Sequence, residues 1–169
     1  MKTFNIRTAQ DADCDALMDL YEEFHAFHVD GVPEWLRLPD LSDAQARGQE
    51  RARLRDLLQA LVRNLSAALL CAEVDGQIVG LAEVYLRHDE PHPLTRHYTY
   101  GHLQSLIVTA RWRRCGVGRQ LTAAVEAWTR DHGGTQLRLG AWEFTRGPLP
   151  FYEALGYRTV KRELVKPLA

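Results

Sequence analysis

Two glycines, Gly116 and Gly118, lie between an apolar run and a segment with helical spacing. Glycine lets backbone N–H groups approach a ligand closely, and the first N–H groups of a helix have no partner within the helix. The helix dipole adds partial positive charge at the same place. Full charges come from four arginines around the turn: Arg111, Arg113, Arg114 and Arg119. This combination predicts a site for an anion, most simply a phosphate or pyrophosphate.

Two common phosphate-binding motifs fit this turn poorly. A Walker loop ends in Gly-Lys-Ser/Thr, whereas Gly118 is followed by Arg119 and Gln120. A dinucleotide fingerprint needs a third glycine where Leu121 stands, and no acid occupies the expected ribose position. The pattern that remains is Arg-x-x-Gly-x-Gly, starting at Arg113. The alternative is a plain helix start with solvated arginines.

The flanks of the turn predict the elements that hold it. The residues 103–108 are aliphatic or β-branched at most positions and have the length of a strand. If that strand is regular, alternate residues from His102 onward share one face, namely His102, Gln104, Leu106 and Val108. After the turn, apolar residues recur at helical spacing until Gly133: Val117, Leu121, Ala124, Val125 and Trp128.

The rest of the chain predicts the order strand, two helices, three strands, helix, strand, helix, strand. Asp11 or Asp13 is expected to cap the first helix, whose apolar face includes Leu17 and Leu20. The Asp75-Gly76 pair between two apolar runs predicts a hairpin. The stretch 27–41, with two prolines, is expected to be irregular. Further elements are strands at 4–7, 67–74, 77–87, 136–142 and 158–165, and helices at about 42–64 and 149–155.

Composition limits the classes of function. A chain of 169 residues with 46% hydrophobic and 25% charged residues suits one soluble domain, spanning 1–169. A net charge of −1 disfavours nucleic acid as a partner, and no apolar run approaches the length of a membrane span. The three cysteines have no pattern typical of disulfides or zinc, so we expect the protein to reside in a reducing cytoplasm. His25 and His28 lack a third ligand, so no metal is expected.

Two motifs and the order of elements resemble the GCN5-related N-acetyltransferase (GNAT) family. The Arg-x-x-Gly-x-Gly pattern, preceded by Leu106-Ile107-Val108, is similar to that family's acetyl-CoA loop. The second motif, PFYEALGY at 150–157, is close to the family's FYEKLGF. The resemblance covers nearly the whole chain. It implies an α/β (α+β) fold, with a mixed central sheet of six to seven strands flanked by about four helices.

The resemblance also implies how acetyl-CoA is held. The pantetheine would pair with the strand at Leu106, Ile107 and Val108, and a backbone N–H at Ile107 or Val108 would polarise the thioester carbonyl. Thr145 stands where the family commonly has an asparagine, so contacts near the thiol are expected to differ. The pyrophosphate would lie on the loop residues Arg113, Arg114, Cys115, Gly116, Val117, Gly118 and Arg119. Cys115 would contribute its N–H; a reactive thiol is the alternative.

Two side chains are candidates for proton transfer. His102 lies on the cofactor strand and can titrate near neutrality, so it is the candidate base. Tyr152, in the second motif, is the candidate acid for the departing thiolate. The alternatives are a hydrogen-bonded histidine and an interior aromatic ring that have no role in catalysis. A carboxylate acting through water, such as Glu143, is the next candidate base.

The sequence therefore predicts an acetyl-CoA-dependent N-acetyltransferase. The acceptor would be a primary amine of a small molecule or peptide, attacking directly in a ternary complex. A non-catalytic acyl-CoA-binding module is the alternative, and it would need neither His102 nor Tyr152. We expect no nucleic-acid or membrane partner and leave a homodimer open.

Overall fold

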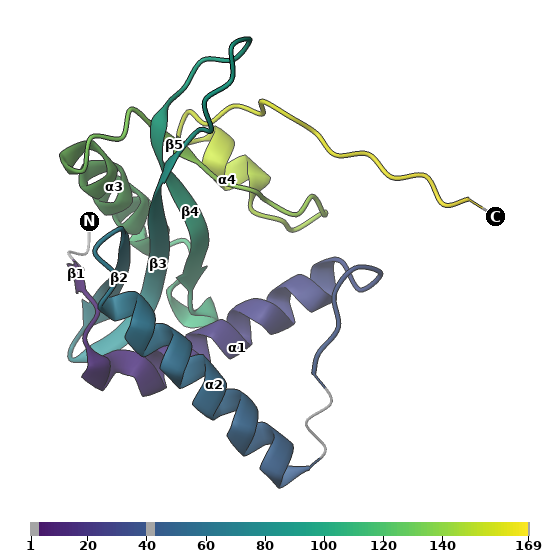
Figure 1. Ribbon diagram of the computed structural model, residues 1–169. Helices are drawn as coiled ribbons and strands as arrows, with labels where there is room; N and C mark the ends of the chain where they lie inside the picture. The colour runs from purple at the N-terminus through teal and green to yellow at the C-terminus, as the bar shows by residue number, and fades with distance from the viewer. Residues whose placement is uncertain (1–3, 40–42, 169) are drawn as a thin grey trace.

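The computed structural model describes residues 4–39 and 43–168. Its centre is a five-stranded sheet in the order β1-β2-β3-β4-β5 (Figure 1). The first four strands are antiparallel neighbours, and β5 is parallel to β4, so the sheet is mixed. The strands are β1 Asn5–Thr8, β2 Ala67–Val74, β3 Gln77–His88, β4 Thr99–Val108 and β5 Gln136–Arg138.

Helices cover both faces of this sheet. The α-helices are α1 Cys14–Gly31, α2 Ala44–Val62, α3 Val117–Asp131 and α4 Leu149–Glu153. Short 3-10 turns, η1 Asp11–Asp13 and η2 Ala110–Trp112, precede α1 and follow β4. One core lies between the sheet and α1 with α2, and the other between the sheet and α3 with α4. The predicted apolar positions Leu17, Leu20, Leu121 and Val125 are all buried.

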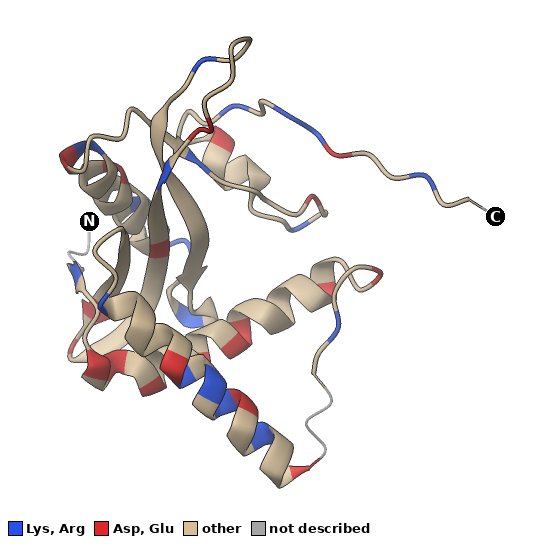
Figure 2. Ribbon diagram, in the orientation of Figure 1, with Lys and Arg blue, Asp and Glu red and all other residues tan. Residues whose placement is uncertain are grey.

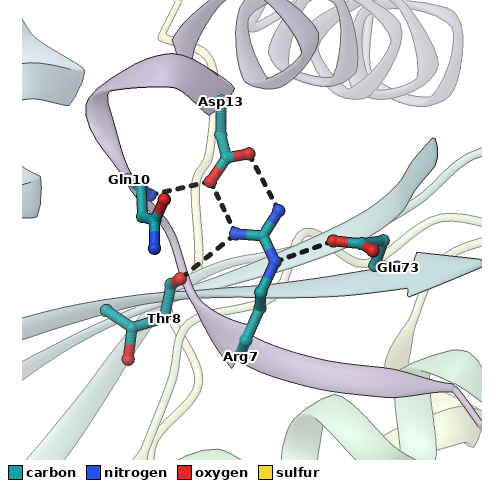
Figure 3. Close-up of polar contacts among 5 residues, drawn as sticks. All are labelled: Arg7, Thr8, Gln10, Asp13 and Glu73. Atoms are coloured by element: carbon teal, nitrogen blue, oxygen red, sulfur yellow. Dashed lines mark hydrogen bonds and ion pairs between the residues drawn. The ribbon is translucent and has the colours of Figure 1, made fainter. Parts of the chain in front are cut away.

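A cluster of charged groups joins β1, η1 and β2. Arg7 on β1 donates two hydrogen bonds to Asp13 of η1, at 2.7 and 2.9 Å, and one to Glu73 of β2 at 2.7 Å (Figure 3). Asp13 also accepts from the backbone N–H of Gln10 at 2.7 Å. Hydrogen bonding to Arg7 lowers the pKa of Asp13. This cluster fixes the start of α1 on the sheet.

The predicted hairpin at Asp75-Gly76 is confirmed. Both residues have positive φ, 50° and 76°, which suits a two-residue turn between antiparallel strands. β2 and β3 are buried along most of their length, because α1 with α2 and α3 pack against opposite faces.

Three expectations differ from the structure: the irregular segment after residue 27, the length of the strand that begins at residue 136, and the strand at 158–165. α1 continues to Gly31 instead of becoming irregular at Phe27, because the rings of Phe27 and His28 pack against Phe144. β5 has three residues, and 158–168 forms no regular structure, so the sheet has five strands instead of six or seven within the described residues. The expected start of the second helix at about residue 42 lies outside the described residues.

A β-bulge overturns the prediction that alternate residues of β4 share a face. Glu83 of β3 faces Ser105, but its neighbour Val84 faces Leu103, so Gln104 is an extra residue in β4. Leu103, Leu106 and Val108 contact the core under α3, whereas Ile107 belongs to the core under α1. His102, next to Leu103, therefore points to the side of α1, opposite to Leu106 and Val108.

Candidate active site

The strands β4 and β5 diverge after a short paired region. β5 pairs with β4 only from Tyr100 to His102. Beyond His102, β4 continues to Val108 with no described strand on that side. A cleft of about 1640 Å³ lies along the paired region and β5, between these strands, α4 and residues 158–165, and both His102 and Tyr152 line it; β4 beyond His102 does not. The two predicted catalytic side chains are thus brought to one cleft.

The unpaired edge of β4 has specific backbone groups to offer. Thr109 N–H donates to Val79 of β3 at 3.0 Å. Because antiparallel pairs alternate, Ser105 and Ile107 then also direct their groups towards β3, and Leu106 and Val108 direct theirs to the open side. Val108 C=O accepts from Arg113 Nε at 2.9 Å, which agrees with this direction. The edge therefore fits an extended amide chain such as pantetheine.

His102 reaches the cleft from the side of α1. It is half-buried and faces Tyr85 across the β3–β4 pair. Tyr85 packs on the core under α1, and Tyr100, a further cleft residue, lies two positions before His102 on β4. The imidazole therefore lines the same cleft as Tyr152.

A buried carboxylate on the strand beside His102, Glu83 of β3, has no counterpart among the predicted site residues. Glu83 of β3 accepts hydrogen bonds from Tyr21 at 2.5 Å, Tyr85 at 2.6 Å and Ser105 at 2.9 Å. Burial, followed by the charge and hydrogen bonding of Glu83, raises the pKa of both phenols, so they remain donors. The signal in the sequence was a glutamate in the middle of an apolar strand.

Tyr152 reaches the same cleft from α4. Its side chain is 8% exposed and lies between the rings of Phe151 and Tyr157, at centroid distances of 5.2 and 5.5 Å. Burial raises the pKa of Tyr152 to about 12. The phenol is therefore fully protonated near neutral pH and can donate a proton to an anion in the cleft.

The glycine turn begins α3, as predicted. Gly116 has φ +93°, and Arg114 also has a positive φ of 61°. The exposed side chains of Arg114 and Arg119 flank the first turn of the helix. The first N–H groups of α3 and two exposed guanidinium groups form a fitting site for a pyrophosphate.

Two members of the loop have other partners. Arg113 donates to Val108 C=O and to Glu23 of α1 at 3.0 Å, and its guanidinium lies over the ring of Phe27 at 4.8 Å. Its side chain therefore holds the loop against α1. The Cys115 N–H donates to Trp112 at 3.4 Å, and the thiol is exposed.

Not every predicted residue meets the cleft. The loop residues 113–119 do not line it but lie beyond the other end of the open edge of β4. Thr145 is exposed and also outside the cleft lining, in a loop whose Phe144 packs on α1. Glu143 does line the cleft and makes an ion pair of 3.9 Å with Arg162.

Two tryptophans stack at the mouth of the cleft. The rings of Trp35 and Trp142 have centroids 6.4 Å apart and an interplanar angle of 29°. They remain 52% and 42% exposed, and both line the cleft together with their neighbours Glu34 and Glu143. An aromatic pair beside two carboxylates attracts cations.

Residues 4–39 and 43–168 contain no group of three His, Cys, Asp or Glu side chains placed to hold a metal ion. The described helices include none with the length and apolar character needed to cross a membrane.

Two proteins with related sequences are acetyltransferases by name. Aminoglycoside N(6')-acetyltransferase type 1 from Stenotrophomonas maltophilia is 44% identical over 84 residues, 50% of this chain and 54% of that protein. The match thus spans about half of that relative. The uncharacterized N-acetyltransferase YhfO from Bacillus subtilis is 26% identical over 153 residues, covering 90% of this chain and 89% of that protein.

Solved structures agree in fold. A mutant of the BH1408 protein from Bacillus halodurans superposes with a TM-score of 0.84 at 20% identity, covering 98% of this chain and 99% of that one. The aminoglycoside N-acetyltransferase AAC(6')-Iy in complex with CoA gives a TM-score of 0.67 at 19% identity, with 98% and 99% covered. The predicted fold class is confirmed. The family model described as "Acetyltransferase (GNAT) family" matches residues 16–157, and the chain belongs to this family of acetyl-CoA-dependent acetyltransferases.

Proposed function

We propose that this protein transfers the acetyl group of acetyl-CoA to a primary amine of a small, cationic molecule of the aminoglycoside type. The observation that carries the proposal is the cleft along β5, which is lined by both His102 of β4 and Tyr152 of α4. A binding module without chemistry would need neither side chain.

In this proposal each group has one task. The first turn of α3, with Arg114 and Arg119, binds the pyrophosphate. The open edge of β4 binds the pantetheine, and the N–H of Val108 polarises the thioester carbonyl. Val108 is preferred to Ile107 because Ile107 directs its backbone groups towards β3.

The proton transfers follow from the two side chains in the cleft. His102 takes the proton of the attacking amine, directly or through one water. The new C–N bond forms as the C–S bond breaks, and Tyr152 donates its phenolic proton to the departing sulfur. Tyr152 then regains a proton from solvent, and His102 releases to solvent the proton that it took from the amine. The raised pKa of Tyr152 supports this order, because the phenol carries its proton at neutral pH.

The acceptor class rests on the mouth of the cleft. Trp35 and Trp142 offer flat apolar faces, and Glu34 and Glu143 offer negative charge. Amino sugars combine rings with ammonium groups, so they match both features. The half-length match to an aminoglycoside acetyltransferase supports the same class.

An acceptor screen tests this proposal. Purified protein is incubated with acetyl-CoA and aminoglycosides, polyamines or peptides, and free thiol release is measured against a no-acceptor control. We expect kcat/KM to be highest for aminoglycosides. A peptide preferred over every amino sugar would contradict the acceptor class. Acetyl-CoA binding with no turnover on any amine would favour the non-catalytic module.

A further inference from the structure

Arg138, the last residue of β5, brings a guanidinium group next to the proposed base. It pairs with His102 across the parallel strands β4 and β5, and neighbouring strands lie about 4.8 Å apart. Both side chains line the cleft. Figure 2 shows many charged residues on α1 and α2 and few on the sheet, and Arg138 is the one lysine or arginine of β4 and β5. A positive charge at this place opposes the approach of a cationic acceptor.

A carboxylate outside the cleft lining compensates for this charge. Asp89, which follows β3, accepts two hydrogen bonds from Arg138, of 2.7 Å from Nη1 and 2.9 Å from Nη2. Hydrogen bonding within the pair lowers the pKa of Asp89 and raises the pKa of Arg138, so both groups are ionised near neutral pH. The bidentate pair therefore has no net charge.

Other contacts hold each member of the pair in place. The Arg138 guanidinium lies over the ring of Tyr100, 3.9 Å from its centroid, and its Nε donates to Gln136 Oε1 at 2.9 Å. Asp89 Oδ2 accepts from the N–H of Tyr98 at 3.1 Å, and the Asp89 N–H donates to the C=O of Tyr98 at 3.0 Å. Either member is therefore expected to stay in position when an uncharged amide replaces the other.

We propose that Asp89 determines the charge of the acceptor that the cleft takes, by cancelling the charge of Arg138 beside the reacting amine. Asp89 acts through Arg138 and touches no substrate, so it is a specificity-determining residue. With the pair intact, an ammonium group can approach His102. With Arg138 unpaired, the cleft repels that group and favours an acceptor that carries an anion. This inference rests on the proposed function, because it takes the acceptor to be a cation.

Single variants of the two members should change acceptor binding in opposite directions. Asp89→Asn leaves Arg138 unpaired, so the dissociation constant for kanamycin, a cationic aminoglycoside, should rise about fivefold or more. Arg138→Gln leaves Asp89 unpaired, so this constant should fall. Calorimetry on protein saturated with CoA measures both constants without any turnover. The loss of a purely structural ion pair would weaken binding in both variants, and that result overturns the proposal, as does unchanged binding.

The double variant Asp89→Asn, Arg138→Gln separates charge from structure. It removes both charges, so binding of kanamycin should return close to that of the wild type. Binding as weak as in Asp89→Asn alone overturns the proposal. The matched control is Glu90→Gln, because Glu90 is an exposed acid next to Asp89 that does not line the cleft. The control should bind like the wild type. The difference between the single variants should shrink at about 0.5 M salt, which screens charges.

Acetyl transfer to kanamycin, measured on the same proteins, separates this inference from the proposed function. Turnover by the wild type, with both single variants changed in the same direction, refutes the role of Asp89 and leaves the proposed function intact. Opposite changes in binding without acetyl transfer refute the proposed function and leave the role of Asp89 intact. A wild type that does not bind kanamycin overturns the inference.

Discussion

Ser105 Oγ donates a hydrogen bond of 2.9 Å to Glu83 Oε2, its neighbour across β3 and β4. The bond lies on the sheet face covered by α1, because Tyr21 of α1 donates to the same oxygen. It marks the point where the bulge at Gln104 changes the phase of β4. His102 is on this face as well, while the α4 residue Tyr152 packs with the core on the other.

His102→Gln tests the proposed base. Glutamine keeps a polar side chain but cannot take up a proton, so turnover should fall about 10²-fold or more with nearly unchanged acetyl-CoA affinity. The acidic limb that a histidine base gives to the rate profile should disappear. Steady-state kinetics across pH and calorimetry measure both. The control is His88→Gln, which pairs with Thr99 and does not line the cleft. Wild-type turnover with an unchanged limb would transfer the role to a carboxylate such as Glu143.

Tyr152→Phe tests the proposed acid and keeps the ring that packs in the core. Turnover should fall about ten- to a thousandfold, because a thiolate can leave without a donor, only more slowly. The pKa of about 12 means that the phenol stays protonated well above neutrality, so the ratio of wild type to variant should be constant from pH 6 to 9. Tyr157→Phe is the matched control. Full turnover in Tyr152→Phe would remove this residue from the mechanism.

Gly118→Asp tests the phosphate site at the start of α3. A Cβ at this position would lie 3.3 Å from Phe151, and the carboxylate would add negative charge beside the expected pyrophosphate. Acetyl-CoA affinity should fall at least tenfold, roughly 1.4 kcal/mol or more. Calorimetry measures the affinity, with Gly48→Asp in α2 as control. If the variant folds and binds as well as wild type, the loop assignment is wrong.

Trp142→Ala tests the acceptor mouth. It removes one ring of the stacked pair, so KM for a cationic acceptor should rise about three- to thirtyfold, the equivalent of roughly 0.5–2 kcal/mol. KM for acetyl-CoA should stay the same. Trp128→Ala on α3, whose ring stacks on His132, is the control for loss of a tryptophan. An equal rise in both KM values would mean that the variant disturbs the cleft as a whole.

Arg7→Met tests the cluster that anchors α1. At pH 7 the free energy of unfolding should fall by about 1–2 kcal/mol, less than buried charged hydrogen bonds would give, because the Arg7 side chain is 29% exposed. Asp13 has a lowered pKa, so its contribution is present above its ordinary pKa of 3.8 and is lost as the pH falls. The difference between wild type and variant should therefore shrink below about pH 4.

Denaturant unfolding at pH 7 and pH 3 measures this difference. Arg53→Met, which removes an exposed pair with Glu50 within α2, is the control and should leave stability unchanged within error. A difference between wild type and Arg7→Met that stayed the same at both pH values would show that Asp13 does not carry it.

Local patterns in the sequence predicted most of the elements. The helical spacing of α3, the Asp75-Gly76 hairpin and the glycine turn each depend on residues close in the chain. The long extent of α1 depends on Phe144, more than a hundred residues away, and prolines in the next segment obscured it. The number of strands likewise depends on whether residues 158–168 pair with the sheet, which their own composition does not decide.

The sequence predicted which residue types form the site, but not the side of the sheet on which each side chain lies. Regular alternation placed His102 with Leu106 and Val108, and one extra residue at Gln104 reversed that relation. Nothing in the local sequence marks this bulge. The Glu83 network could have been suspected from a lone acid in an apolar strand, but its three donors come from three separate segments.

Gly31 and Phe144 pack closely and so hold together the two segments that carry Trp35 and Trp142. A Cβ on Gly31 would lie 2.5 Å from the Phe144 ring, so no larger residue fits while that ring is in place. The end of α1 leads to Trp35, and the segment before Phe144 carries Trp142. The distance between the two tryptophans is therefore set by the contact of the Phe144 ring with the backbone of Gly31. In the proposed function, the size of acceptor that fits between the tryptophans is then set by Gly31 and Phe144, neither of which lines the cleft.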